Sequence, residues 1–293
     1  MTARSRPDEE PSRGGFSNLL RALFSGIPWS ESAERTDVLR EPLGRGGAVR
    51  VHNSNGRIHV IGEAREDVEV RACKRARAES QDAAARLLDD IVVESSNDAG
   101  GLSFEVQIPK RWNRRGNVNL QVRVPRTAPV AIEAVNGKLL VEGLRSTVRA
   151  HSSNGPISVD DVIGDIELHT SNGKVSCTTT KGRLRARCSC GKIELREHCG
   201  PVDASTSNGS IRAMLDDVEN GDVRLATSNG RIVLELPDAI DADVDVHVDN
   251  GVFRNERELG QETRTVNGRV RGVLGAGGSL VRLRCSNGSI SIR

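Results

Sequence analysis

The chain has 293 residues, a formal net charge of +2 and only 2% aromatic residues, with no tyrosine. This balanced charge is not that of a polyelectrolyte, and the shortage of rings weakens any function that needs stacking, such as single-stranded nucleic-acid binding. No apolar run approaches the length of about 18 residues that indicates a membrane-spanning helix. The six cysteines do not follow the pattern of a small disulfide-rich secreted domain, so we expect small buried thiols.

Residues 1–42 begin with a polar tail that contains prolines, and an apolar stripe follows it. The stripe has the i, i+3, i+4, i+7 spacing of an amphipathic helix. It comprises Phe16, Leu19, Leu20, Leu23, Phe24 and Ile27. Only Arg21 supplies a cation inside it, so we favour docking onto the first coil or a partner over binding to a membrane surface. The segment lacks the features of a convincing signal peptide, and we expect a cytoplasmic or peripherally membrane-associated protein.

Residues 43–126 are predicted to form an N-terminal β unit with an inserted helix. Alternating apolar residues indicate strands over Val68–Ala72, Leu102–Ile108 and Val118–Val124. The run Ala78–Leu88 has helical periodicity and is the only helix expected in this part of the chain.

Residues 127–293 are predicted to form regular repeats, because a two-residue turn that ends in glycine recurs along the chain. Ten copies occur, one of them upstream at Asn55, and Cys190 replaces asparagine in a single copy. The asparagines are Asn55, Asn136, Asn154, Asn172, Asn208, Asn229, Asn250, Asn267 and Asn287. From Asn136 to Asn208 the step is a constant 18 residues, and later steps are 21, 21, 17 and 20.

Apolar and polar residues alternate on both sides of each turn, as in half-buried strands. The turn would be a hairpin in an antiparallel meander and a corner in a β-solenoid. In the even stretch the outward position five residues before the turn holds Arg149, Glu167, Arg185 and Asp203 in succession. Opposite charges one repeat apart suit side chains that are direct neighbours, because like charges facing each other destabilise a sheet. We therefore predict an all-β, single-stranded β-solenoid with coils of about 18–21 residues.

The repeat units "HSSNGPISVDDV", "TSNGKVSC", "TSNGSIRAML" and "TSNGRIVLELP" resemble the bacterial putative-adhesin family of β-strand repeat proteins. The upstream block "VRVHNSNGRIHVIG", a short helix and "NVNLQVRVP" resemble the N-terminal half of that family, a domain of unknown function. The resemblance covers residues 43–293. It implies a right-handed β-solenoid-like fold and no established catalytic residues.

The sequence contains one cluster of residue types that can bind a metal, Cys188 and Cys190 followed by His198 and Cys199. Alternation points Cys188 inward and places Cys190 at a corner, so the four side chains are not expected to converge as a zinc site requires. No phosphate loop or nucleophile motif is present. We expect no cofactor, no metal and no catalytic residue.

A basic residue stands two positions after several of the turns. These residues are Arg57, Lys138, Lys174, Lys192, Arg231 and Arg269. On a solenoid they would form a stripe along one edge that attracts an anionic polymer or lipid headgroups. The alternative is an ordinary solvated face whose cations are offset by neighbouring carboxylates.

These patterns favour a non-enzymatic repeat scaffold that presents surfaces for adhesion or macromolecular binding at the cell envelope. Its expected partners are an unidentified protein or an anionic envelope polymer, with self-association through the solenoid ends and peripheral membrane contact as further candidates. Nucleic acid is not expected. The alternatives are a cytoplasmic polymer-forming scaffold that resembles the bactofilins and, ranked lower, a polysaccharide-acting β-helix enzyme.

Overall fold

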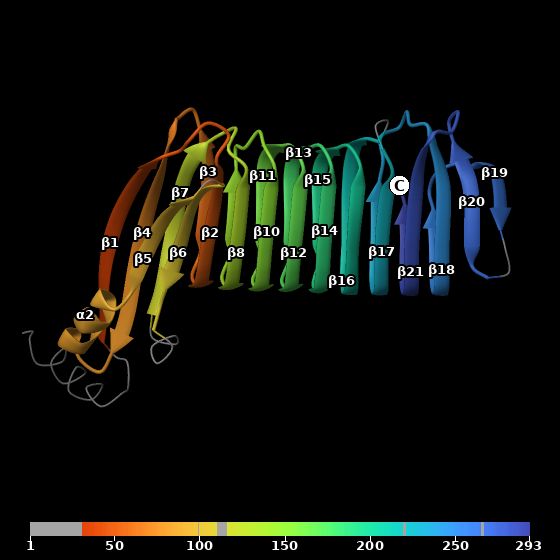
Figure 1. Cartoon of the computed structure of the whole chain (residues 1–293). Coiled ribbons are helices and arrows are strands. Elements are labelled where there is room, and N and C mark those ends of the chain that lie inside the picture. Colours follow the sequence, from red (N-terminus) through yellow and green to blue (C-terminus); the bar gives the residue numbers. More distant parts are fainter. Residues whose placement is uncertain (1–30, 99, 110–115, 219–220, 265–266) are drawn as a thin grey trace, which may run out of the picture.

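The computed structural model describes residues 31–98, 100–109, 116–218, 221–264 and 267–293, and the predicted helix at residues 16–27 lies outside them. The described chain is a long stack of strands with one helix, α2 (Gln81–Asp89), near the N-terminal end (Figure 1). The strands are β1 (Glu31–Pro42), β2 (Ala48–Asn55), β3 (Ile58–Glu63), β4 (Asp67–Ala78), β5 (Val92–Asp98), β6 (Gly101–Gln107), β7 (Gly116–Pro125), β8 (Val130–Asn136), β9 (Leu139–Glu142), β10 (Val148–Asn154), β11 (Ile157–Ile163), β12 (Ile166–Asn172), β13 (Val175–Lys181), β14 (Leu184–Cys190), β15 (Ile193–Cys199), β16 (Val202–Asp217), β17 (Val223–Glu235), β18 (Ala242–Asn255), β19 (Gly260–Arg264), β20 (Arg269–Leu274) and β21 (Ser279–Ile292).

The central part is a β-solenoid, as the repeat pattern predicts. Each coil contributes one strand before its Asn-Gly corner and one after it, and each strand pairs in parallel with its equivalent in the next coil. We call the layer of strands before the corners the first wall and the layer after them the second wall. The charged column of Arg149, Glu167, Arg185 and Asp203 is in register on neighbouring parallel strands, which confirms the solenoid over the meander.

The corners explain the Asn-Gly signal. A Cβ atom built on Gly230, whose φ is +153°, would lie 1.8 Å from the carbonyl oxygen of Gly209 in the adjacent coil, so only glycine fits. The asparagine side chains form a hydrogen-bonded ladder along the same edge. For example, Asn154 Nδ2 donates to Asn136 Oδ1 at 3.1 Å, and Asn172 Nδ2 donates to Asn154 Oδ1 at 3.0 Å.

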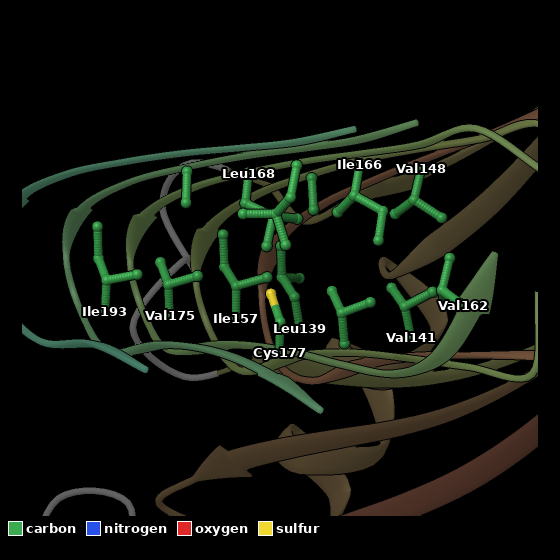
Figure 2. Close-up of a cluster of buried hydrophobic side chains, with 14 of the residues drawn as sticks. Leu139, Val141, Val148, Ile157, Val162, Ile166, Leu168, Val175, Cys177 and Ile193 are labelled. Carbon is green, nitrogen blue, oxygen red and sulfur yellow. The ribbon is translucent and has the colours of Figure 1, made fainter. Parts of the chain in front are cut away.

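The core is a narrow column of aliphatic side chains between the two walls (Figure 2). Ile157, Val175 and Ile193 stack on successive coils of the second wall and are fully buried. Leu168 and Ala186 face them from the first wall and are also fully buried. Small and branched side chains suit this space because the walls are close and each residue packs on its equivalents in the neighbouring coils.

The N-terminal end changes from parallel to antiparallel pairing. Strand β4 pairs with β7 on one side and with β1 on the other, so residues 31–42 belong to the sheet. Ser80 caps the N-terminus of helix α2, because its side chain accepts a hydrogen bond from the Ala83 N–H, and the helix buries Ala84, Leu87 and Leu88. The predicted helix and strands of this half all occur, with β4 extending further than the pattern indicates.

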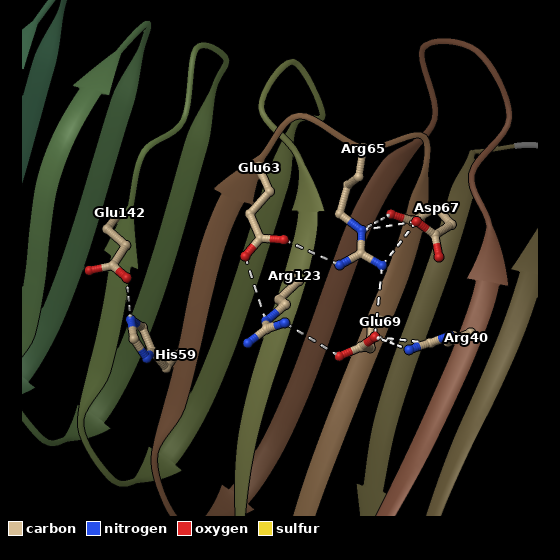
Figure 3. A network of polar contacts seen from close by, with 8 residues as sticks. All are labelled: Arg40, His59, Glu63, Arg65, Asp67, Glu69, Arg123 and Glu142. Carbon is tan, nitrogen blue, oxygen red and sulfur yellow. Dashed lines mark hydrogen bonds and ion pairs between the residues drawn. The ribbon is translucent and has the colours of Figure 1, made fainter.

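A polar network joins four strands of this end on its outer face (Figure 3). The Glu69 carboxylate, almost fully buried, lies 2.9 Å from Arg40 Nη2 and 3.8 Å from Arg123 Nη1. Arg65 donates to Asp67 and approaches Glu69 to 4.0 Å. The hydrogen bond from Arg65 lowers the pKa of Asp67, so this carboxylate stays ionised beside the Arg65 guanidinium.

The C-terminal end departs from the predicted order of coils. Strand β21 lies between β17 and β18 and pairs in parallel with both, although β18, β19 and β20 precede it in the chain (Figure 1). Asn267 turns the β19–β20 hairpin, because these two strands are antiparallel. The prediction that its turn is a solenoid corner is therefore wrong. Polar Gln261 and Thr263 occupy positions that are apolar in true coils, so this segment cannot fill the core.

Candidate functional site

Five of the six residues predicted to form the basic stripe lie in one column of the second wall. The neighbouring residues Ile58, Leu139, Ile157, Val175 and Ile193 are in register, which places Arg57, Lys138, Lys174 and Lys192 along one edge beside the corners. Arg231 continues the column in β17. Arg269 does not belong to it, because it begins β20 and its guanidinium binds the Asp245 carboxylate at 2.6 and 2.7 Å.

A groove opens in the surface where this column crosses the last coils. Its volume is about 640 Å³. Its walls include Lys192, Ser210, Arg212, Arg231 and Ser289, which come from β16, β17, β21 and the corner before β15. Ser210, Arg231 and Ser289 are in register on three adjacent strands, so a serine residue flanks Arg231 on each side. The arrangement offers donors to oxyanions at the strand spacing of about 4.8 Å.

Cations outnumber carboxylates around the groove. Glu194 accepts from Lys174 at 2.5 Å and from Arg196 at 2.7 Å, and Lys192 lies 3.4 Å away. The hydrogen bond from Lys174, with that from Arg196, lowers the pKa of the Glu194 carboxyl to about 2. The Glu194 carboxylate is therefore ionised at neutral pH and offsets one of the three cations around it.

The other cations beside the groove are Arg212 and Arg231. Arg212 pairs with Glu235 at 3.2 Å. Arg231 is exposed and makes no ion pair or side-chain hydrogen bond with any of the residues that the structure describes. Among the described residues, Lys174, Lys192 and Arg196 surround Glu194, Arg212 pairs with Glu235, and Arg231 pairs with neither carboxylate. These five cations therefore exceed the two carboxylates by three positive charges.

In the described part of the chain, the side chains of the Cys188, Cys190, His198 and Cys199 cluster do not converge on one point. Cys188 is buried and donates to the Gly173 carbonyl, whereas Cys190 is exposed in the asparagine ladder. His198 is buried, and its Nδ1 lies 2.9 Å from Thr180 Oγ1. Within the described ranges no group of three His, Cys, Asp or Glu side chains is placed to hold a metal ion.

Sequence reasoning found part of the groove and missed the rest. The alignment of turns identified Lys192 and Arg231, and the column two positions later would have added Arg212 and Glu194. Ser289 could not be placed beside Arg231 from sequence, because their contact depends on the out-of-order position of β21.

These observations define a β-solenoid scaffold of parallel coils with a cationic groove beside one row of corners. The chain belongs to the Toastrack DUF4097 family, which it matches over residues 48–293. No curated protein matches it. Among the described residues, no helix is long and apolar enough to cross a membrane.

Two solved structures are similar to the chain. One is a putative adhesin from Bacteroides fragilis NCTC 9343, with a TM-score of 0.44 and 12% identity over 88% of this chain and 97% of that one. The other is a putative cell adhesion protein from Clostridium sporogenes ATCC 15579, with a TM-score of 0.29 and 10% identity over 89% and 99% of the two chains.

Proposed function

We propose that this protein is a non-enzymatic scaffold that binds an anionic envelope polymer along its cationic groove. The observation that carries the proposal is the excess of three positive charges around a groove lined by Arg231, which forms an ion pair with none of the described residues. A concave surface of one charge sign concentrates ligands of the opposite sign. The preferred ligand is a chain with repeated phosphate, sulfate or carboxylate groups, because donors recur along the stripe at a regular spacing.

The groove supports binding better than catalysis. A nucleophilic serine needs a base within hydrogen-bond distance and a third group that orients the base. Ser210 and Ser289 lie among arginine and lysine side chains, and the described structure shows no hydrogen bond from either hydroxyl to a histidine or carboxylate. The cations can hold an anion, but they lack the means to activate a hydroxyl at neutral pH.

The proposal is tested with polyphosphate and dextran sulfate as polyanionic probes and neutral dextran as the control ligand. Calorimetric titration of the full chain should show binding of the polyanions, and affinity should fall as salt rises. A hydrogen bond to a charged group contributes about 1.5 kcal/mol, so Arg231→Gln should weaken binding about tenfold.

Arg149→Gln is the matched control variant, because Arg149 is also exposed but lies on the first wall beside Glu167. Its affinity should stay close to that of the unaltered chain. Equal losses in the two variants, or binding that does not respond to salt, would show that the groove is not the site. Turnover of a polymer by the purified chain that Arg231→Gln abolishes would overturn the non-enzymatic assignment.

A further inference from the structure

The C-terminal strand β21 occupies a slot that the rest of the chain leaves for it. The chain passes from β17 to β18 through residues 236–241, forms β18, β19 and β20, and only then returns to insert β21 between β17 and β18 (Figure 1). Every strand from β8 to β17 instead lies beside its equivalent in the preceding coil. The last coil is therefore completed by a separate segment.

The slot holds β21 along the whole length of the strand. Thirteen residues of β18, all those from Ala242 to Asn255 except Asp249, pair with β21. Strand β17 pairs with the opposite edge of β21. Val281, Leu283 and Ile290 are fully buried between the two walls. The asparagine ladder passes through the strand as well, because Asn287 donates to Asn229 and accepts from Asn250 at 3.0 and 3.1 Å.

The connection to β21 is a short glycine-rich hinge, Gly275-Ala276-Gly277-Gly278. Gly275 and Gly277 have φ values of +58° and +81°, a left-handed backbone that reverses the chain at once. The closed hinge is fastened by one side chain, since Asp241 Oδ1 accepts a hydrogen bond from the Ala276 N–H at 2.7 Å. Glycine residues with positive φ can equally adopt an extended backbone. The same four residues could therefore direct β21 away from the slot of its own chain.

We propose that β21 exchanges between two copies of this chain, so that each copy's slot receives the C-terminal strand of the other. The contacts of β21 with β17 and β18 are the same in the closed monomer and the exchanged dimer, and only the hinge differs. The balance between the two forms is then set by protein concentration and by the hinge conformation. A dimer assembled in this way needs no new surface.

Exchange of β21 would also change which copy contributes each residue of the groove, and its effect on binding rests on the proposed function. Gly288 and Ser289 line the groove beside Arg231, so each groove of an exchanged dimer is built from both copies. Two linked grooves bind one polymer chain with higher avidity than a single groove does. The exchange itself does not depend on any ligand and is tested without one.

The test places one reporter cysteine on each side of the slot, in separate chains. Arg231 and Ser289 are paired residues on adjacent strands, a separation that a disulfide can span. Full-length Arg231→Cys and Ser289→Cys chains, both also carrying Cys73→Ser, Cys190→Ser and Cys199→Ser to remove the accessible native thiols, are mixed unfolded, refolded together at high concentration and mildly oxidised. Exchange predicts a covalent dimer in the mixture and none when either chain is refolded alone.

Two controls make the result decisive. A single chain with both reporter cysteines, refolded dilute, should form an internal disulfide, and failure to do so would refute the placement of β21 on which the proposal stands. Replacing Arg231→Cys by Arg149→Cys in the mixture should abolish the dimer, because Arg149 lies on the other wall far from the slot in the strand order.

The hinge gives an independent readout. Inserting six Gly and Ser residues after Gly277 lengthens a surface connection at little cost in stability. The longer hinge lets β21 reach its own slot easily, so the share of dimer in light scattering should fall below that of the unaltered chain at equal concentration. An internal disulfide in the doubly substituted chain, with only monomers in the mixture at every concentration, would overturn the proposal.

Discussion

At the scale of single residues, Cys190 interrupts an otherwise continuous asparagine ladder. Asn208 Nδ2 lies 4.0 Å from Cys190 Sγ, whereas the equivalent distances elsewhere in the ladder are 3.0–3.1 Å to an amide oxygen. Cys190→Asn should restore two amide hydrogen bonds, each contributing about 0.5–1.5 kcal/mol to the free energy of unfolding. Urea unfolding should show a raised midpoint, while Ser189→Ala, at an exposed neighbouring position, should leave it unchanged. A midpoint lowered by Cys190→Asn would contradict the ladder as a source of stability.

His198 should make the protein less stable in mild acid. Burial lowers the pKa of the imidazole from 6.5 to about 4, so the folded chain resists a proton that the unfolded chain accepts. Its contribution to stability is therefore present above pH 6.5 and is lost as the pH falls from 6.5 to 4. A shift of this size corresponds to about 3 kcal/mol. Unfolding free energies at pH 7 and pH 4.5 should differ more for the unaltered chain than for His198→Gln, and equal differences would show that another group is responsible.

At the scale of elements, the same Asn-Gly signal produces two structures with different chemistry. In the corners the glycine N–H is fixed between coils, as when Gly155 N donates to Asn172 O at 2.9 Å, and it cannot attack the preceding asparagine side chain to form a succinimide. Asn267-Gly268 lies in the β19–β20 hairpin and outside the ladder. Prolonged incubation at mildly alkaline pH should deamidate Asn267 first, with Asn154 as the internal comparison in peptide mass spectrometry. Faster loss at Asn154 would mean that the corners do not protect their asparagines.

This difference also marks how far the sequence could predict the fold. The fixed step and the alternation were enough for the coils from β8 to β16, because every coil there repeats the same contacts with its neighbours. They could not place β21, since its apolar residues fit any slot with the same columns. The segment around Asn267 could have filled the same slot, but the polar residues Gln261 and Thr263 prevent it from packing in the core. The full lining of the groove could not be predicted either, because Ser289 belongs to β21.

At the scale of the whole molecule, stability should be shared among neighbouring coils. Ile193 is fully buried in the centre of the solenoid, between Val175 and Ile211 on the adjacent strands. Ile193→Ala should cost about 2–5 kcal/mol, because it removes buried methyl groups and leaves a cavity. Ile163 is the matched control, since its side chain is 46% exposed at the opposite corner of a coil. Ile163→Ala should change the free energy of unfolding by no more than about 0.5 kcal/mol.

The spatial extent of the damage tests the solenoid further. Each coil is stable only through its neighbours, so hydrogen exchange in Ile193→Ala should accelerate together in β13, β15 and β16. Strand β4 and helix α2 pack in the N-terminal end and lie several coils away, so their amides should keep more of their protection. Acceleration confined to β15 would indicate that coils open independently. Uniform acceleration through α2 would instead show that the whole chain unfolds as a single cooperative unit, so that the damage is not confined to neighbouring coils.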